Sequence, residues 1–524
     1  MTITSFLFLG FLAAALAVYY AVPKKVRWIV LLAASLVFYA LAAGWAGLWL
    51  GYTALTVYLG GLALGRLRVK REAAAAAGGE QDVQPYDRAR KWVCGGVAAA
   101  NFAALYALKY WNFTAQLFQP LVSRLSDSAQ VPLLTLALPL GISFFMFQSV
   151  GYLIDVYRGK YPPQRNFWKL LLFAGFFPQM IQGPISRYRE LAPQLYDGSD
   201  LDFTNLKYGI QLAMWGYFKK LVIADRAAVL VNTVMADPWS WSGSIQAVGI
   251  LFYCIQLYGD FSGGIDVVRG AAKLFGIDLA ENFRRPIFAR SLTDFWRRWH
   301  ITLGGWMRDY LFYPLSLSKP FAALGRFARK HMKGKAGRIF AASLATFIVY
   351  FVIGVWHGAS WRYIAFGFWN GGLITLSLLL AEPFAKLKKR LHINEKALWF
   401  VLFQVARTNL IVFFGRYITR APRLLTAVWM VKELFLRPGF SSLWDGTLLT
   451  LGLTGFDFAV TLLGMAAVLG LEFYQEQGGH VRAALEKKSF FVQWLAILAP
   501  LLVLLCFGLL KGGNISESFI YQQF

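Results

Sequence analysis

The sequence contains little charge and few cysteines for a chain of 524 residues. Charged residues make up 15% of it, whereas a soluble globular domain carries about 25%. This shortage excludes an ordinary water-soluble enzyme. The three cysteines, Cys94, Cys254 and Cys506, lie in apolar surroundings without the spacing of metal ligands. We therefore expect them to pack, and we expect no bound metal and no disulfide framework.

Acidic residues are the scarcer charged class. The chain has 27 Asp and Glu against 53 Lys and Arg, which gives a formal net charge of +26. One explanation is that basic loops remain on the cytoplasmic side and meet anionic lipid headgroups. The other is that some cationic groups meet a phosphate-bearing donor or an acidic carrier, and the two are compatible. We expect membrane lipids among the partners and no nucleic acid.

Long apolar runs recur along the chain, and each is long enough to cross a hydrocarbon core of about 30 Å as a helix. The sequence therefore predicts an all-α polytopic membrane protein with about 11 to 13 transmembrane or re-entrant helices. The expected spans lie near residues 3–22, 28–44, 47–65, 92–110, 131–156, 167–183, 207–233, 244–258, 339–356, 362–381, 397–418, 452–472 and 491–511.

Two of these spans contain helix-breaking residues, in "LPLGISFF" at 138–145 and "FFPQMIQGPI" at 176–185. Broken helices at membrane depth are tolerated only where protein or a water-filled cavity surrounds the freed backbone groups. We therefore expect these segments to lie around a polar cavity.

The basic residues set the expected orientation. Lys24, Lys25 and Arg27 fill the first short loop, and further Lys and Arg residues flank "EAAAAAGGEQDVQP" at 72–85. This predicts that the N-terminus lies outside and that the first helix is retained, not cleaved as a signal peptide. The Ala- and Gly-rich stretch itself is predicted to be a flexible cytoplasmic loop.

Residues 281–338 are too charged to span lipid, yet they are crowded with Trp, Phe and Tyr. Within them, apolar residues recur at spacings of four and three, which predicts one helical stripe. Ser291 is placed to cap the helix start, and Asp294 is placed to pair with Arg298 one turn on. Such a helix either lies flat at the cytoplasmic interface or dips into the protein. The stripe consists of Leu292, Trp296, Trp299, Leu303, Trp306 and Tyr310.

Two of the five histidines, His300 and His357, lie in aromatic and largely apolar surroundings, whereas His331, His392 and His480 lie in loops. A lone histidine in such surroundings is often a hydrogen-bonded core residue. Ionisable groups at membrane depth are nevertheless usually functional, and imidazole is well suited to move protons near neutral pH. Both histidines are therefore candidate catalytic residues.

The basic residues also place the two candidate histidines. Arg326 to Arg338 precede the run at 339–356, and Lys386 to Arg390 follow the run at 362–381, so both ends of this hairpin are expected to be cytoplasmic. The turn after His357 then points to the far side or into a pocket open to it. His300 belongs to the cytoplasmic side, and this arrangement suggests group transfer across the membrane.

Four stretches carry a family resemblance: "FWRRWHITLGGWMRDYLFYPL" at 295–315, "VWHGASW" at 355–361, and the segments 258–291 and 176–195. With them the chain resembles the membrane-bound O-acyltransferases, and more closely their bacterial alginate O-acetylase branch. The resemblance covers most of residues 1–440. It implies a ring of tilted helices around a central funnel, with a thin floor between the cytoplasmic and outer cavities.

The resemblance implies three parts of the chain and two residue roles. The parts are an N-terminal three-helix segment at 1–91, a catalytic core at 92–440 and C-terminal transmembrane helices at 441–524. His357 of "WHG" is implied to be the catalytic base, and His300 a second polar residue of the reaction path. Eukaryotic relatives carry asparagine where this chain has His300, which indicates a positioning role.

The chain departs from the family at one place, where such proteins often show a further His-Gly and this chain has Asn370-Gly371. Asparagine can orient a group by hydrogen bonding, but it cannot act as a base at neutral pH. We therefore assign Asn370 no role in proton transfer and keep it as a candidate for contact with a substrate.

The resemblance also suggests which side chains shape the donor channel. Arg297, Trp299, Asp309 and Trp356 are the candidates, with a structural ion pair as the equal alternative for Arg297 and Asp309. Asp260 in "YGDFSGG" and Arg407 in "VARTNL" are further buried charges, for which we favour packing against a partner over contact with a substrate.

The implied reaction is direct transfer of an acetyl group to an exported polysaccharide. The donor is acetyl-CoA or another acyl thioester from the cytoplasm, with no bound cofactor. The implied location is a bacterial inner or plasma membrane, with a separate periplasmic or extracellular acetyltransferase as partner. Two alternatives stay open: D-alanyl transfer to teichoic acid, and a transporter that moves an acetyl or glycan carrier without catalysis.

Overall fold

The computed structural model describes residues 2–78, 80–124, 130–135, 138–180, 182–332 and 334–509. Within these residues the chain is helical and has no strand, and an isolated bridge joins Phe283 and Trp299. Six helical stretches of the described chain are long and apolar enough to cross a membrane, or seven if two helices that meet at 58° form one span. The predicted all-α, multi-pass membrane fold is confirmed.

Two compact units divide the described residues: a first unit within Met1–Ala213 and Val267–Ala280, and a second unit within Met214–Asp266 and Glu281–Phe524. The helices that begin in the first unit are α1 (Phe6–Ala21), α2 (Arg27–Ala43), α3 (Leu48–Gly78), α4 (Glu80–Lys109), α5 (Trp111–Val122), α6 (Ile142–Tyr157), α7 (Phe167–Gly175), α8 (Phe177–Met180), α9 (Tyr188–Asp197) and α10 (Phe203–Tyr217).

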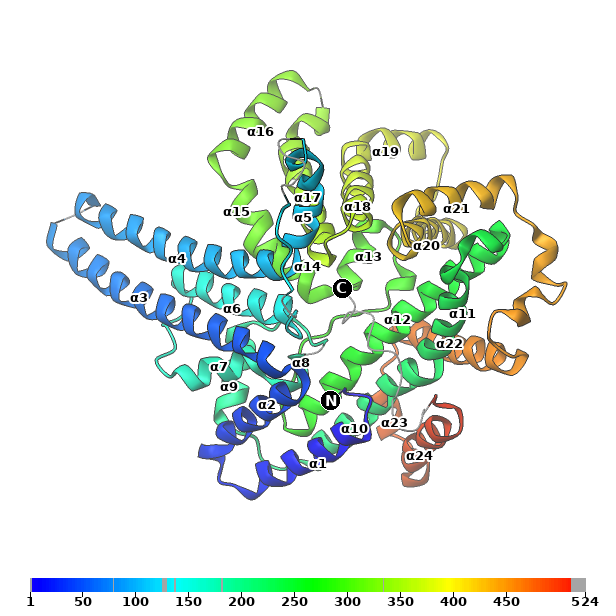
Figure 1. Ribbon diagram of the computed structural model, residues 1–524, viewed down its shortest axis with the longest axis horizontal. Helices are drawn as coiled ribbons and strands as arrows, with labels where there is room; N and C mark the ends of the chain where they lie inside the picture. Colours follow the sequence, from blue (N-terminus) through cyan, green and yellow to red (C-terminus); the bar gives the residue numbers. More distant parts are fainter. Residues whose placement is uncertain are drawn as a thin grey trace. The chain divides into compact units, whose positions relative to one another are not determined.

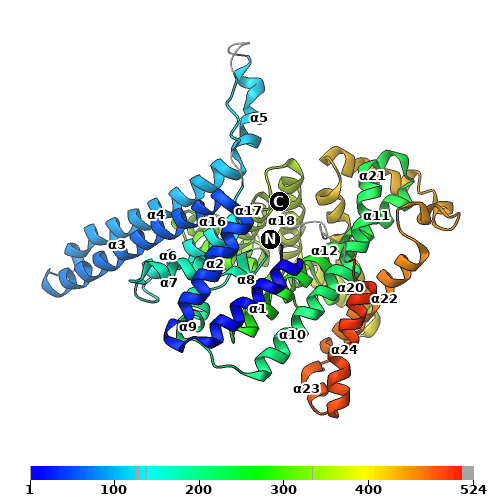
Figure 2. The same cartoon turned by 60° about the horizontal axis from the view of Figure 1, so that its bottom comes forward.

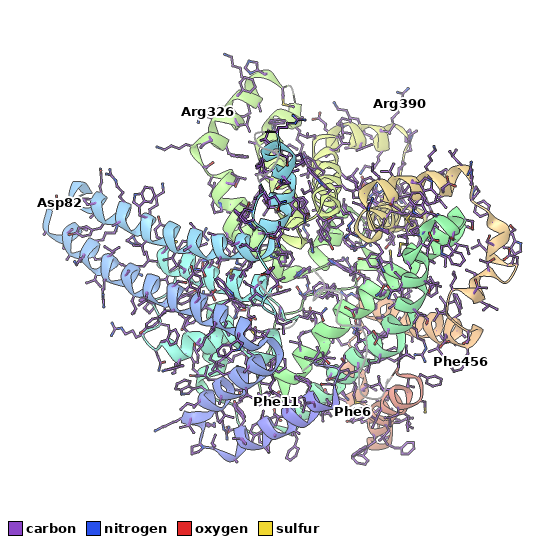
Figure 3. The ribbon with its side chains drawn as sticks, viewed as in Figure 1. Phe6, Phe11, Asp82, Arg326, Arg390 and Phe456 are labelled. Carbon is purple, nitrogen blue, oxygen red and sulfur yellow. The ribbon has the colours of Figure 1, made fainter. Side chains whose placement is uncertain are left out.

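The prediction of a flexible loop at residues 72–85 is wrong. Helix α3 continues to Gly78 and α4 begins at Glu80, so the two form a long hairpin (Figures 1 and 2). Figure 3 labels Asp82 near its tip, while Gly79 lies outside the described residues. A run of five alanines favours helix over coil, and an ion pair of 2.7 Å between Arg71 and Asp87 joins the two helices.

The interruptions predicted in the first unit are confirmed, but one helix is shorter than expected. The span predicted at 131–156 is helical only from Ile142, because Gly141 adopts a left-handed conformation with φ of 71°. A Cβ atom at Gly141 would lie 2.1 Å from the carbonyl oxygen of Met180, so a side chain is excluded there. The second interruption separates α7 from α8, whereas residues 136, 137 and 181 of these spans lie outside the described chain.

The second unit carries both candidate histidines. Its helices are α11 (Asp225–Ala236), α12 (Gly243–Leu274, whose last turns belong to the first unit), α13 (Leu292–Arg298), α14 (Ile301–Met307), α15 (Tyr313–Ser316), α16 (Lys319–His331), α17 (Gly334–His357), α18 (Trp361–Leu379), α19 (Ala381–Arg390), α20 (Leu398–Arg420), α21 (Leu424–Leu436), α22 (Gly455–Glu476), α23 (Val481–Glu486) and α24 (Phe490–Phe507). The predicted span at 491–511 ends outside the described residues.

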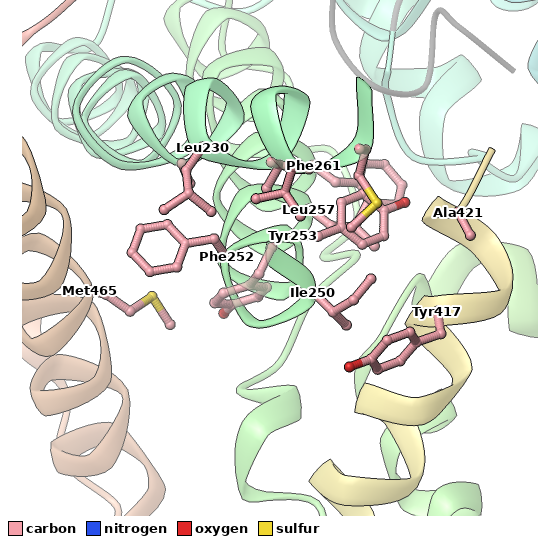
Figure 4. Close-up of a cluster of buried hydrophobic side chains, with 14 of the residues drawn as sticks. Leu230, Ile250, Phe252, Tyr253, Leu257, Phe261, Tyr417, Ala421 and Met465 are labelled. Atoms are coloured by element: carbon pink, nitrogen blue, oxygen red, sulfur yellow. The ribbon is translucent and has the colours of Figure 1, made fainter. Parts of the chain in front are cut away.

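Helix α12 is the central element of this unit. Figure 4 shows its side chains between Tyr417 of α20 on one side and Met465 of α22 on the other. Tyr253, Leu257 and Phe261 of α12 are buried in this cluster. The burial of these large apolar side chains fixes α20 and α22 against α12, at about 1.5–3 kcal/mol for each side chain.

The span predicted at 207–233 is interrupted by a π-helical segment at Phe218–Ala224. This segment carries two buried lysines, and each of them pairs with carboxylates. Lys219 lies 2.6 Å from Asp266, and Lys220 lies 2.5 Å from Asp260. The predicted packing role of Asp260 against a charged partner agrees with this pair. Buried charges are tolerated because they are paired in this way.

Candidate active site

The hairpin of α17 and α18 holds one candidate histidine, and glycines bring its two helices into close contact. A Cβ atom at Gly354 would lie 2.6 Å from Cα of Gly367, and one at Gly367 would lie 3.0 Å from Cα of Phe351. Small residues allow helix backbones to approach in this way within a membrane. The close contact fixes the end of α17, where His357 is the last residue.

His357 lies at the turn of this hairpin, as the sequence predicts. The side chain is half-buried, and the next residue, Gly358, would place a Cβ atom 2.7 Å from the ring of Tyr363. The opposite ends of the hairpin join α16 and α19, whose residues Arg326 and Arg390 Figure 3 labels at the same edge of the second unit. Helix α17 is about 36 Å long at 1.5 Å per residue, so its basic start and His357 are separated by roughly the thickness of a membrane.

The other candidate histidine does not lie on one continuous helix, as the stripe predicted. The helix stops at Arg298, Trp299 is extended, and His300 is left-handed with φ of 51° before α14 begins. The physical reason is a competing set of backbone hydrogen bonds. Arg284 N donates to Arg298 O at 2.8 Å, and Ile301 N donates to Asn282 O at 3.0 Å, so the segment 282–284 takes backbone groups that a continuous helix would use.

The broken helix is nevertheless capped and paired as predicted. Ser291 Oγ accepts from Asp294 N at 3.1 Å, and Asp294 pairs with Arg298 at 3.2 Å. A position flat on the surface is excluded because most of the stripe is buried. The buried members are Leu292, Trp296, Trp299, Leu303 and Trp306.

His300 is buried with 1% of its surface exposed. Its Nδ1 lies 3.3 Å from Oδ1 of Asn282, and the same oxygen accepts from N and Oγ1 of Thr302. The backbone donor of Thr302 fixes the amide orientation, so Nδ1 of His300 carries the proton and Nε2 is the basic nitrogen. Burial lowers the pKa of His300 from 6.5 to about 3, so the imidazole is neutral at physiological pH.

Both histidines contact the ring of one tryptophan. The ring centroid of Trp356 lies 5.9 Å from that of His300 and 5.1 Å from that of His357. The ring of Phe261 also contacts His300, with a centroid distance of 4.9 Å and a nearly perpendicular orientation. The structure therefore brings the two predicted catalytic residues, and the predicted Trp356, into one cluster.

Asn370 lies beside this cluster and holds the broken helix against the hairpin. Its Oδ1 accepts from Nε1 of Trp296 at 3.0 Å, and its Nδ2 donates to the carbonyl oxygen of Phe366 at 2.9 Å. The amide is buried, and both of its functional atoms are used within the protein. Its contacts in this structure therefore attach α13 to α18.

The remaining predicted residues differ in their burial and in their partners. Trp299 is buried, stacks on Phe295, and has the guanidinium carbon of Arg416 5.1 Å from its ring centroid. Arg297 is exposed. Asp309 lies 3.2 Å from the exposed Arg308, which fits the structural alternative.

Arg407, the other charge singled out in α20, faces outward. It is exposed, and its Nη2 donates to the carbonyl oxygen of Arg290 at 3.0 Å. At the C-terminal end of α20, the carbonyl oxygen of Ala421 accepts a hydrogen bond at 2.6 Å from Arg362, which lies in the first turn of α18.

Sequence reasoning missed three residues around the broken helix. Asn282 orients His300, Glu476 pairs with Arg285 at 2.7 Å and with Arg298 at 3.0 Å, and Arg416 contacts Trp299. Arg416 had a signal, because it is a charge within the apolar run 397–418. The other two had none, since only the fold brings them to residues far away in the sequence.

Comparison with known proteins agrees with this arrangement. The model of the MBOAT, membrane-bound O-acyltransferase family matches residues 164–417. A probable alginate O-acetylase of Pseudomonas putida is 30% identical over 541 residues, which cover 99% of this chain and 99% of that protein. The chain belongs to the membrane-bound O-acyltransferase family. As a member of it, the protein is an O-acyltransferase and a multi-pass membrane protein.

Two further relatives of this acyltransferase are named for the transfer of acetyl groups. A probable alginate O-acetylase of Azotobacter vinelandii is 32% identical and covers 90% of this chain and 85% of its own length. A peptidoglycan O-acetyltransferase of Helicobacter pylori is 30% identical and covers 65% of each. The family match includes Asn282, both candidate histidines and Arg416, whereas Glu476 lies beyond its end.

Proposed function

We propose that this acyltransferase transfers acetyl groups from a cytoplasmic acyl thioester for the O-acetylation of an exported polysaccharide. The observation that carries the proposal is the ring of Trp356, which both His300 and His357 contact. The imidazole at the end of an apolar hairpin and the imidazole in the buried break of a charged segment thus share one aromatic neighbour. The acetyl O-transferases among the relatives support an acetyl group as the cargo.

His357 is the base in this proposal. A sugar hydroxyl oxygen attacks the carbonyl carbon of the thioester, the carbon–sulfur bond breaks, and the hydroxyl proton passes to the imidazole of His357. The proton then leaves with the thiolate as a thiol. His357 is the last residue of α17, and the carbonyl groups at a helix C-terminus stabilise the imidazolium that proton uptake produces.

His300 positions a reactant and does not titrate. Its buried ring is neutral and its Nδ1 is bonded to Asn282, so Nε2 can accept a hydrogen bond. This function needs a fixed ring and no change of charge, which agrees with asparagine at the same place in eukaryotic relatives. Trp356 and Trp299 shape the apolar surroundings in which the thioester is held.

The donor and the partners are part of the same proposal. Acetyl-CoA is the thioester we expect, and the exposed Arg297 is placed to meet its anionic groups. We expect a separate periplasmic or extracellular acetyltransferase as a partner of this protein. No resident cofactor is needed, because the thioester already carries an activated acyl group.

The test is substitution of the base in a cell that exports an acetylated polymer. His357→Ala is expected to lower O-acetylation by about 10²- to 10⁴-fold while the protein still accumulates in the membrane. His480→Ala, on an exposed loop histidine, is the matched control and should retain wild-type acetylation. Wild-type acetylation in His357→Ala would exclude both the base assignment and catalysis by this site.

A second assay separates the donor classes. Purified wild-type protein is given radiolabelled acetyl-CoA or a radiolabelled D-alanyl carrier, and the label transferred to an acceptor glycan is counted. Transfer of acetyl alone supports the proposal. Transfer of D-alanine alone would place the protein with the D-alanyl transferases and overturn the proposed donor.

A further inference from the structure

Arg416 is a buried cation beside the candidate active site. Its side chain lies in the interior with 6% of the residue surface exposed, on helix α20. The guanidinium carbon lies 5.1 Å from the ring centroid of Trp299. Among the residues that the structure describes, no carboxylate pairs with this guanidinium and no oxygen accepts a hydrogen bond from it. Its recorded contact is the face of Trp299.

Five other arginines of the second unit form hydrogen bonds or ion pairs. Arg285 and Arg298 pair with Glu476, Arg407 and Arg362 donate to backbone carbonyl oxygens, and Arg420 donates to Asn232 at 2.6 Å. The buried carboxylate of Glu472 accepts a hydrogen bond from Tyr258. The described residues therefore supply hydrogen bonds or ion pairs to these five arginines and none to the guanidinium of Arg416.

A buried charge without an anion is costly. The effective penalty for taking an ion out of water is several kcal/mol, and a cation–π contact returns about 2 kcal/mol when desolvated. The remaining cost is offset if an anion from outside the chain binds there. Guanidinium presents a planar pair of donors that fits a carboxylate or a phosphate with two parallel hydrogen bonds.

The position of Arg416 links the two histidine-bearing segments. Trp299, which it contacts, directly precedes His300 in the chain. One turn further along α20, the carbonyl oxygens of Thr419 and Ala421 accept from Arg362, which follows the turn after His357. An anion on Arg416 would therefore lie beside the cluster in which acyl transfer is proposed.

We propose that Arg416 is an anion-binding residue of the acyl-transfer site and holds an oxyanion carried by a substrate. The inference rests on the proposed function, which supplies two sources of that chemistry. One is a phosphate of the thioester donor, and the other is a carboxylate of an acidic sugar in the acceptor. In both cases the bound anion orients its substrate toward His357.

The experiment compares charged and uncharged versions of each substrate in three purified proteins: wild type, Arg416→Gln and Arg407→Gln. Acetyl-CoA is compared with acetyl-pantetheine, which lacks the phosphates, and a uronic acid oligosaccharide with its neutral counterpart. Arg407→Gln is the matched control, because it removes an exposed arginine from the same helix. KM and kcat are measured for each pair.

Arg416→Gln is expected to raise KM about 10- to 100-fold for the substrate that carries the anion and to leave KM of its uncharged version unchanged. A shift confined to acetyl-CoA identifies the donor phosphate, and a shift confined to the uronic acid identifies the acceptor carboxylate. Equal KM values in wild type and Arg416→Gln, or equal shifts for charged and uncharged versions, would overturn the proposal.

Stability supplies a readout that does not depend on turnover. Without ligand, Arg416→Gln should unfold at a temperature equal to or above that of wild type, because it removes an uncompensated buried charge. Inorganic phosphate or glucuronate should raise the unfolding temperature of wild type and not of the variant. A variant that is less stable than wild type and equally stabilised by both probes would contradict an anion site.

The two proposals fail in different ways. If wild-type protein transfers no acetyl group from any donor, the proposed function is wrong. If wild type transfers acetyl and Arg416→Gln behaves like Arg407→Gln with every substrate, only the role of Arg416 is wrong. If Arg416→Gln raises KM for a charged substrate, Arg416→Lys should raise it less. Lysine keeps the positive charge but loses the paired donors of the guanidinium.

Discussion

The two segments that carry the candidate histidines are held in place by different forces. The α17–α18 hairpin around His357 is fixed by close contact between helix backbones at Gly354 and Gly367. The broken helix around His300 is fixed by polar bonds, which run to Asn282 and Glu476 and to the amide of Asn370. Packing places one imidazole, and hydrogen bonds place the other.

This difference matches the tasks that we propose for the two residues. A base that changes its charge must remain accessible, and His357 is half-buried at a turn. A positioning residue must not titrate, and His300 is sealed by aromatic rings with its Nδ1 bonded. The comparison teaches that one cluster can use the same side chain in two ways when the surroundings differ.

The largest effect on the hairpin is expected from Gly354→Ala. The added Cβ would lie 2.5 Å from the carbonyl oxygen of Tyr363, and overpacking of this kind costs about 1–3 kcal/mol. Gly372→Ala on α18 is the control, because no atom lies within 4 Å of its Cβ position, and removal of a helical glycine should stabilise by about 0.5–1 kcal/mol. Thermal unfolding in detergent measures both, and changes of the same sign would show that packing does not fix the hairpin.

In the broken helix, which polar bonds hold in place, Asn282→Ala should release the ring of His300. Three contacts to Oδ1 of Asn282 are lost, and a displaced catalytic group costs about 10²-fold in rate. The expected result is a lower kcat with little change in KM for the donor. Asn409→Ala removes a half-buried amide that donates to Ile287 O at 2.8 Å and should leave kcat near wild type. Equal losses in both variants would mean that the amide of Asn282 acts only through stability.

The burial of His300 should appear as sensitivity of the fold to acid. The unfolded chain binds a proton at a pKa near 6.5 and the folded chain only near 3, so the contribution to stability is complete above pH 6.5 and is lost as the pH falls below it. At about pH 5 the loss is about 2 kcal/mol. His300→Asn should lack this component when unfolding is compared at about pH 7.5 and about pH 5. An identical acid loss in both proteins would contradict the buried, neutral ring.

The smallest effect is expected from Glu476→Gln, which removes the ion pairs to Arg285 and Arg298. These side chains are partly exposed, so the cost is about 1 kcal/mol or less. The loss should shrink at high salt, because salt screens such pairs. Glu486→Gln, on an exposed glutamate, is the control for thermal unfolding. A large loss that does not depend on salt would mean that Glu476 does more than hold the broken helix.

Much of the fold could be predicted from hydropathy, because a chain in a membrane must bury its backbone in helices. The cap at Ser291, the pair of Asp294 with Arg298 and the hairpin turn at His357 follow from local spacing, and all three are confirmed. The break at His300 could not be predicted. It depends on a segment more than a dozen residues earlier that competes for the same backbone groups.

The candidate site could be predicted only in part, because contacts between segments far apart in the sequence bring some of its residues together. The two histidines and Trp356 lie in motifs that can be read locally, whereas Asn282 and Glu476 enter through contacts that only the fold creates. The prediction of a flexible loop at 72–85 was wrong because the alanines of this stretch have a high helix propensity and extend α3 to Gly78. The division into parts at residues 91 and 440 stays a prediction.

The division of roles between the two histidines is tested most directly by the pH dependence of acetyl transfer in His300→Asn. We expect kcat/KM to fall by about 10- to 100-fold, while the pH at which activity rises stays where it is in wild type, because the variant leaves the proposed base, His357, unchanged. A profile in which this rise shifts or disappears would show that His300 itself takes up the proton, and it would contradict the account.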